Sequence, residues 1–425
     1  MAGLFVFLVL AVGVVGVLAL VGGSQDAVLP GRTSPSAGSS GAVDDTPDET
    51  DLRGDTARAL LSDLTEALEH GSPADVRGLG APQDRGAARE LEALRANVRA
   101  LRIADLSMRY VDEDGGRVTD DQQRTYGDRA WVADVQLGWR VRGFDTGVSQ
   151  REVALTLVET KRGAAFVSAR SDSGKAAPLW LLDRLEVRRT ARSLVALAGS
   201  GDPGLFSGLA DQAVVDVHKV LPGWRGRLVV EVPGDAAELG HVLGTTPGAY
   251  GGIAAVTTTA DGTLTSGAPV HIFVNPQVFD PLGPRGSQIV MSHEATHVAT
   301  GAAVSAMPTW LLEGFADYVA LDHVDLPVSV TASQILASVR KDGPPSRLPG
   351  KTEFDPQSKA LGASYESAWL ACRLLGEKYG EKRLIAFYRA ADRDGSTVGP
   401  FRDLLGSDQR AFTRNWRAYL RGLAG

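Results

Sequence analysis

The chain has 425 residues, of which 44% are hydrophobic and 22% charged, so it is long enough for two globular domains with their own cores. Its formal net charge is −7, with 44 Lys and Arg against 51 Asp and Glu. Because a surface that binds phosphates normally carries a basic excess, this balance argues against nucleic acid as a main partner. The only cysteine, Cys372, excludes an intramolecular disulfide and a cysteine-based metal cluster.

The chain begins with a stretch that has the length and composition of a membrane span. Residues 4–21 are all apolar or glycine, and with the two following glycines the run matches the thickness of a bilayer core. Residues 1–23 are therefore predicted to anchor the protein in the cell membrane as a single-pass helix, with the bulk of the chain outside the cytoplasm. A cleaved signal peptide and a secreted protein are the alternative, although a signal peptide usually has a shorter apolar part that follows basic residues.

Residues 24–51 are rich in Ser, Pro, Gly and Asp, which predicts a flexible linker. Apolar residues then recur with a helical period over residues 52–68 and 87–101, and with a period of two over residues 106–168. Helices followed by an antiparallel sheet predict a small α+β domain over residues 52–178. In the order of its elements, this domain resembles nuclear transport factor two and cystatin-like modules. Spacing, dimerisation and substrate recruitment all remain open as its role.

The second half of the chain alternates strands with helices. The pattern predicts a strand over residues 187–197, a helix over 209–221, a strand over 227–232 and a helix over 235–243. Asp235 is a typical N-cap for the last of these helices. The chain ends with three further predicted helices, over residues 365–379, 381–391 and 409–420.

An HExxH motif at residues 293–297 carries the strongest chemical signal. On a helix, His293 and His297 lie one turn apart on the same face, so both imidazoles can bind one tetrahedral metal ion. Glu294 then lies beside a water molecule activated by the metal, where a carboxylate can take the water's proton and pass it to a leaving amine. The motif therefore predicts a zinc hydrolase.

A second helical pattern, which follows shortly afterwards, carries Glu313 and, one turn later, Asp317. Glu313 can be the third zinc ligand, which leaves the fourth position open as a catalytic site requires. Asp317 can accept the second ring N–H of a zinc-bound histidine and fix its tautomer. The metzincin pattern HExxHxxGxxH is excluded, because Thr300 and Ala303 stand where it needs glycine and histidine.

The segments HEATH and WLLEGFADY together resemble the gluzincins, specifically the peptidase MA-like domain family, over roughly residues 185–423. The resemblance implies a zincin-like fold for residues 185–425, with a mixed upper sheet, an active-site helix and a helical lower lobe, and with zinc between the lobes. One departure is that only residues 298–312 separate His297 from Glu313, which is shorter than in the aminopeptidase and thermolysin branches.

The resemblance also implies roles outside the two motifs. Tyr365 would steady the tetrahedral intermediate, and an edge strand would pair with an extended substrate. That strand is expected over residues 251–256, and the residues assigned to substrate binding are Gly252, Ile253, Ala254, Ala255 and Val256. A second strand is expected over residues 270–276. Near its start, His271 could line the site, although a position facing solvent is favoured.

Taken together, these patterns predict an α+β, membrane-anchored zinc metallopeptidase with Zn²⁺ as cofactor and a peptide or protein as substrate. One alternative is a non-catalytic envelope binding module with a structural zinc, although such a site has no need of Glu294. The other is a zinc amidohydrolase that acts on a non-protein amide such as a cell-wall crosslink. The choice between endopeptidase and aminopeptidase activity remains open, as does the oligomeric state.

Overall fold

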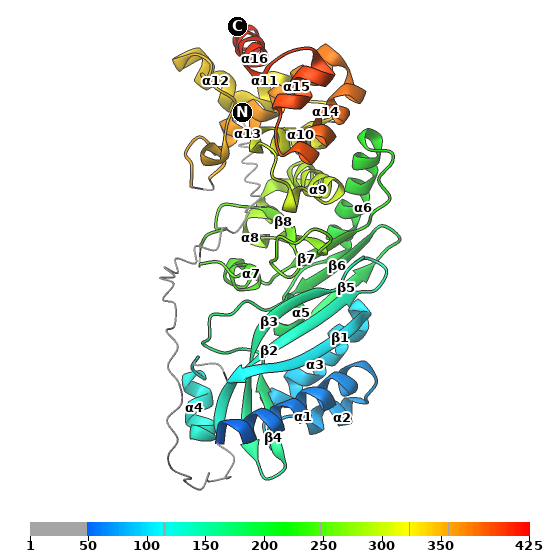
Figure 1. Ribbon diagram of the computed structural model, residues 1–425, viewed down its shortest axis with the longest axis vertical. Helices are drawn as coiled ribbons and strands as arrows, with labels where there is room; N and C mark the ends of the chain where they lie inside the picture. Colours follow the sequence, from blue (N-terminus) through cyan, green and yellow to red (C-terminus); the bar gives the residue numbers. More distant parts are fainter. Residues whose placement is uncertain (1–48, 114–115, 247, 323, 356) are drawn as a thin grey trace, which may run out of the picture.

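A computed structural model describes residues 49–425 apart from 114–115, 247, 323 and 356. Along its long axis, a four-stranded sheet with its helices is followed by a five-stranded sheet and then by a group of helices (Figure 1). The predicted α+β class is therefore confirmed at this coarse level.

The first sheet is antiparallel and has the strand order β1-β2-β3-β4. Its strands are β1 (Ile103–Glu113), β2 (Ala130–Val141), β3 (Ser149–Thr160) and β4 (Gly163–Ser168). The helices of this region are α1 (Glu49–Glu69), α2 (Pro73–Gly78), α3 (Arg85–Leu101), α4 (Asp120–Tyr126) and the 3-10 helix η1 (Gly127–Arg129). Alternation along β2 buries Val135, Leu137 and Trp139 in the same hydrophobic core as the apolar residues of α1 and α3. The predicted helices and strands are present here, and α1 begins inside the segment predicted as a linker.

The second sheet has the order β5-β6-β7-β9-β8, in which β6, β7 and β9 run parallel and the two outer strands run antiparallel to their neighbours. Its strands are β5 (Leu185–Arg189), β6 (Ser193–Ala198), β7 (Leu228–Val232), β8 (Ala255–Thr259) and β9 (Val270–Val274). The helices around it are α5 (Leu179–Leu182), α6 (Pro203–Val220), α7 (Ala236–Leu243), α8 (Pro276–Phe279), the 3-10 helix η2 (Asp280–Leu282) and α9 (Gly283–Thr300). Strand β8 is thus an edge strand, as expected.

Two strand boundaries differ from the predicted ones. The single strand expected over residues 187–197 is the hairpin β5–β6, because the N–H of Thr190 donates to the carbonyl of Ser193 and closes a turn. The edge strand begins only at Ala255. The preceding residues form turns, in which the N–H of Ile253 donates to the carbonyl of Tyr250. A run of small and apolar residues does not distinguish a strand from the turn that leads into it.

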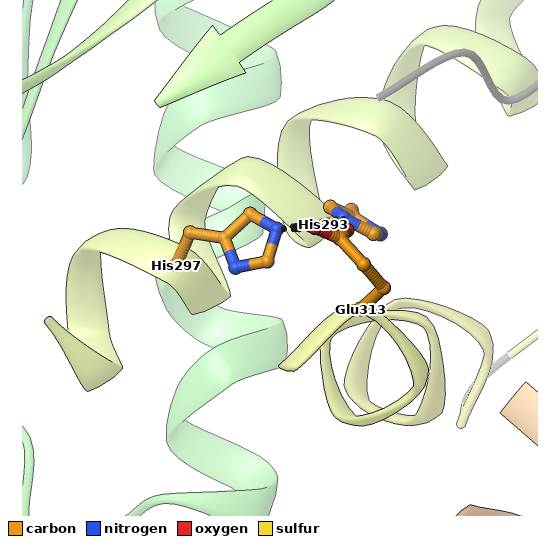
Figure 2. A group of neighbouring side chains, drawn as sticks. All are labelled: His293, His297 and Glu313. Carbon is orange, nitrogen blue, oxygen red and sulfur yellow. Dashed lines mark hydrogen bonds and ion pairs between the residues drawn. The ribbon is translucent and has the colours of Figure 1, made fainter. Parts of the chain in front are cut away.

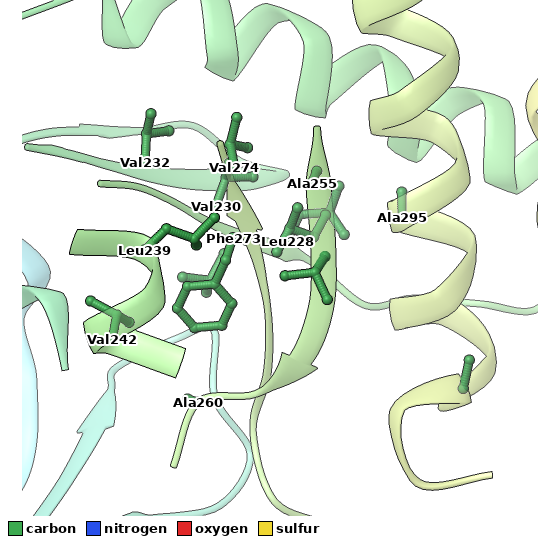
Figure 3. Close-up of a cluster of buried hydrophobic side chains, with 14 of the residues drawn as sticks. Leu228, Val230, Val232, Leu239, Val242, Ala255, Ala260, Phe273, Val274 and Ala295 are labelled. Atoms are coloured by element: carbon green, nitrogen blue, oxygen red, sulfur yellow. The ribbon is translucent and has the colours of Figure 1, made fainter. Parts of the chain in front are cut away.

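Helices cover both faces of the second sheet near its edge (Figure 3). Leu239 and Val242 of α7 lie next to Phe273 on one face, and Ala295 lies on the side of α9 that faces Ala255 of β8 (Figure 3). All five side chains are buried. The HExxH segment is therefore packed directly against the edge strand.

The remaining helices form the third part of the molecule. They are η3 (Ala302–Val304), α10 (Thr309–Leu321), α11 (Val328–Thr331), α12 (Ser333–Asp342), η4 (Lys351–Phe354), α13 (Leu361–Tyr379), α14 (Glu381–Asp394), α15 (Val398–Leu405) and α16 (Gln409–Ala424). Aromatic rings fill the space between them: Phe412 stacks on Trp310 at a centroid distance of 6.0 Å and meets Phe401 at 5.2 Å. Cys372 is buried on α13, as its place on an apolar helix face predicts.

The prediction of a transmembrane helix has to be corrected. Across the described ranges of the chain, no helix is both long enough and apolar enough to cross a membrane. The segment on which that prediction was based, residues 1–23, lies outside the described residues.

Polar contacts that are largely buried connect the two sheets. Arg151 of β3 donates from Nε to the carbonyl of Asp261 at 3.0 Å and from Nη1 to the carbonyl of Val242 at 2.7 Å. His271 of β9 lies 3.0 Å from Asp145, in the β2–β3 loop. The expectation that His271 faces solvent is therefore wrong, because its side chain is buried and the β2–β3 loop contacts it.

Candidate metal centre

Helix α9 is fixed at both ends of its HExxH segment. On one side, Ser292 donates to the buried carboxylate of Asp216 on α6 at 2.9 Å. On the other, Gly301 ends the helix with φ 69°, and its N–H donates to the carbonyl of His297. Glycine adopts this left-handed conformation without steric cost, which lets the chain turn back towards α10.

The three predicted zinc ligands meet in the space between α9 and α10 (Figure 2). His293 Nε2 lies 2.9 Å from His297 Nε2 and 3.2 Å from Glu313 Oε2, and His297 Nε2 lies 3.4 Å from that same oxygen. Ligand atoms about 2.0–2.2 Å from a tetrahedral zinc are separated by roughly 3.3 Å. The three atoms thus have the mutual spacing that a shared zinc ion requires.

The orientation of His293 is fixed from behind by Asp317. The carboxylate of Asp317 lies 2.7 Å from His293 Nδ1, and both side chains are buried. This contact keeps the proton on Nδ1 and directs the lone pair of Nε2 into the cluster. Asp317 therefore occupies the place predicted for it.

The carboxylates of the cluster favour a positive charge among them. Burial alone would lower the pKa of His293, but the charges of Asp317 and Glu313 outweigh it and raise that pKa to about 10. Burial opposes ionisation of Glu313, yet His297 and His293 hold its pKa below the usual value. Burial raises the pKa of Asp317 and of Glu294. A dication among these groups would compensate the negative charge that burial disfavours.

Besides Nδ1 of His297 in the cluster itself, two buried polar atoms around it lack a hydrogen-bond partner among the described residues. Among the described residues, neither Glu294 Oε1 nor the hydroxyl of Tyr365 has a hydrogen-bond partner, although both are buried. The ring of Tyr365 on α13 lies 6.1 Å from the ring of His293, and burial raises the pKa of its phenol well above the usual value. Buried polar atoms normally have partners, so these two are suited to a ligand or reactant.

The structure places the other predicted residues less directly. Gly252, Ile253 and Ala254 lie in the turns before β8, and only Ala255 and Val256 belong to the edge strand itself. Residues that sequence reasoning did not connect with the site also contact it. Thr257 of β8 donates to Glu294, and Phe354 of η4 packs edge-on against Tyr365 at a centroid distance of 5.0 Å. The strand reads Ala-Val-Thr-Thr-Thr, so nothing in the sequence distinguished Thr257 from Thr258 and Thr259.

No protein-family model matches the sequence, and no curated protein matches it. The functional assignment therefore rests on the geometry of His293, His297 and Glu313 and on the residues that contact them.

The close approach of α10 to α13 positions Glu313, and Gly314 makes that approach possible. A Cβ atom at Gly314 would lie 2.3 Å from the carbonyl oxygen of Ala368 and 3.0 Å from Cys372 Sγ. Gly314→Ala should therefore push the helices apart, destabilise the protein by about 1–3 kcal/mol and weaken zinc binding. Urea denaturation and zinc titration measure the two effects.

Gly208→Ala is the matched control, because Gly208 is exposed within α6 and a Cβ atom there has no neighbour within 4 Å. It should leave zinc binding unchanged and slightly raise stability, since alanine favours a helix. Equal zinc affinity and equal stability of Gly314→Ala and Gly208→Ala would show that the close helix approach at Gly314 does not position Glu313.

Proposed function

We propose that this protein is a zinc metallopeptidase of the gluzincin type. The observation that supports it most is the meeting of His293, His297 and Glu313 within 3.4 Å of one another, with Glu294 beside them and Asp317 behind His293. In this proposal, the five-stranded sheet with α9 is the upper lobe of a zincin-like fold and the helices from α10 onward are the lower lobe. The four-stranded sheet with its helices is a module similar to nuclear transport factor two or cystatin.

The chain supplies the groups that peptide hydrolysis needs. His293, His297 and Glu313 would hold a zinc ion, which would supply the Lewis acidity that polarises a substrate carbonyl and makes water nucleophilic near neutral pH. Glu294 Oε1 accepts the proton of the water as its oxygen bonds to the carbonyl carbon, and delivers that proton to the amine nitrogen as the C–N bond breaks. The Tyr365 hydroxyl donates a hydrogen bond to the oxyanion. As the last strand in the order of its sheet, β8 would offer main-chain groups for pairing with an extended peptide.

A binding module with a structural zinc is the second candidate, and the complete burial of His293 and His297 favours it. Glu294 argues against it. A structural site closes its coordination with four protein ligands, whereas this cluster has three and adds a carboxylate with one free oxygen. Peptide hydrolysis by the purified protein separates the two candidates.

The protein should bind about one zinc ion per chain and cleave members of a peptide library. His297→Ala removes one of three ligands and should abolish both properties, and a chelator should inactivate the wild type reversibly. His70→Ala changes an exposed histidine on the first domain and should alter neither. Metal analysis and mass spectrometry of the peptides give the result. A zinc-loaded wild type that cleaves no peptide would leave the structural alternative.

A further inference from the structure

The general base expected from the HExxH motif is held by a residue of the edge strand. Thr257 Oγ1 lies 2.6 Å from Glu294 Oε2 and 3.2 Å from the main-chain carbonyl of Glu294. Thr257 and Glu294 are both almost completely buried, so water does not compete for this contact. A hydroxyl has a single proton to donate, and the shorter distance assigns it to the carboxylate.

This contact makes the two oxygens of Glu294 different. Oε2 is bound to Thr257, whereas Oε1 has no hydrogen-bond partner among the residues that the structure describes. A carboxylate fixed at one oxygen cannot rotate freely about its last bond, so the direction of the other oxygen is fixed as well. Oε1 is therefore the oxygen that faces the reactants.

The sheet and helix packing explain why Thr257 can reach α9. Side chains alternate along β8, so Ala255, Thr257 and Thr259 share one face of the strand. Ala295 lies on the side of α9 that faces Ala255, and two small side chains allow a close approach of strand and helix (Figure 3). Thr257 is paired with Ile272 of the central part of the sheet, which fixes its position along the strand.

We infer that Thr257 is a positioning residue for Glu294. By holding Oε2, Thr257 directs Oε1 towards the reacting water. It also connects the proposed general base to the strand that is proposed to pair with substrate. The inference rests on the proposed peptidase function. A substrate that pairs with β8, the last strand of its sheet, would also order the strand that carries Thr257. Correct substrate pairing and alignment of the base are thereby coupled through one side chain.

Thr257→Val tests the inference, because valine keeps the shape and the β-branch and removes only the hydroxyl. We expect kcat to fall about 10- to 100-fold, the effect of losing a hydrogen bond to a charged group, with KM and zinc content unchanged. Thr257→Ser restores the hydroxyl and should recover kcat to within about threefold, since serine lacks the β-branch that fixes the rotamer.

Thr259→Val is the matched control on the same face of the same strand. Thr259 is equally buried, but its hydroxyl donates to the carbonyl of Thr263 and not to α9. This variant should keep the wild-type kcat. A kcat that falls equally in Thr257→Val and Thr259→Val would mean general damage to β8 and would overturn the inference.

A measurement on the metal-free protein tests the contact without activity. The changes in free energy of unfolding caused by Thr257→Val and by Glu294→Ala should not add up in the double variant. The changes caused by Thr259→Val and by Glu294→Ala should add up in theirs. Additive changes for Thr257→Val and Glu294→Ala would show that the hydrogen bond between Thr257 and Glu294 contributes nothing to stability. Non-additivity together with a normal kcat in Thr257→Val would overturn the positioning role. A wild type that is zinc-loaded and inactive would instead overturn the proposed function, and the catalytic role of Thr257 with it.

Discussion

Glu294→Gln should lower kcat about 10²- to 10⁴-fold while the protein keeps its zinc, because general acid–base catalysis by a positioned side chain contributes that factor. The amide has nearly the same shape as the carboxylate and can still accept the hydrogen bond from Thr257, so the structure around it should not change. What it lacks is an oxygen that accepts and returns a proton. Steady-state kinetics and metal analysis of the same preparation measure both properties.

Glu377→Gln provides the control for this change. Glu377 lies on α13 and forms a partly exposed ion pair with Arg373, with N–O distance 2.7 Å, away from the zinc ligands. Its loss should leave kcat and zinc content at wild-type values. A Glu294→Gln enzyme with wild-type kcat would show that Glu294 is not the base. Loss of zinc in that variant would show that Glu294 acts as a ligand.

His271→Leu should destabilise the protein by about 3–5 kcal/mol, the cost of removing one partner from a buried ionic contact. His271 donates from Nε2 to Asp145 at 3.0 Å and from Nδ1 to Glu231 at 2.6 Å. In the variant, the carboxylates of Asp145 and Glu231, which are mostly inaccessible to water, lose the imidazolium between them. The contact joins the β2–β3 loop to β7 and β9, so the loss should appear as a lower urea midpoint for the whole protein.

The stabilising effect of His271 should depend on pH in a defined direction. Burial alone would lower its pKa, but Asp145 and Glu231 outweigh burial and raise it from about 6.5 to about 10. The folded state therefore holds a proton that the unfolded state releases, and the contribution is complete below about pH 6.5 and disappears as the pH rises towards 10.

The stability difference between wild type and His271→Leu should accordingly shrink between pH 7 and pH 10. His70→Leu, which changes an exposed histidine, should cost little at any of these pH values. A constant difference between wild type and His271→Leu across that range would show that His271 is neutral in the folded protein. A His271→Leu variant as stable as the wild type at pH 7 would show that the buried contact contributes nothing.

The membrane and strand predictions show where sequence patterns are weakest. The run of apolar residues at the start of the chain lies outside the described residues, and the helices that are described contain no membrane span. Residues 251–254 read Gly-Gly-Ile-Ala and lie in the turn and bend before β8, as the low strand preference of glycine explains. In the hairpin β5–β6, the turn at Thr190 falls within the mostly polar residues 188–193, which the prediction of a single strand over residues 187–197 passed over. Such boundaries depend on which main-chain groups find partners, and composition does not determine that.

The sequence by itself identified the candidate donor set of the proposed metal centre, because the spacing of these residues on each helix is a matter of local geometry. His293 and His297 share a helix face through a spacing of four residues, and Glu313 and Asp317 do so on the next helix. Only the tertiary structure decided the contacts of Thr257 with Glu294, of His271 with Asp145, and of Gly314 with α13. Each of these joins segments far apart in the chain, and long-range packing obeys no period that a single sequence displays.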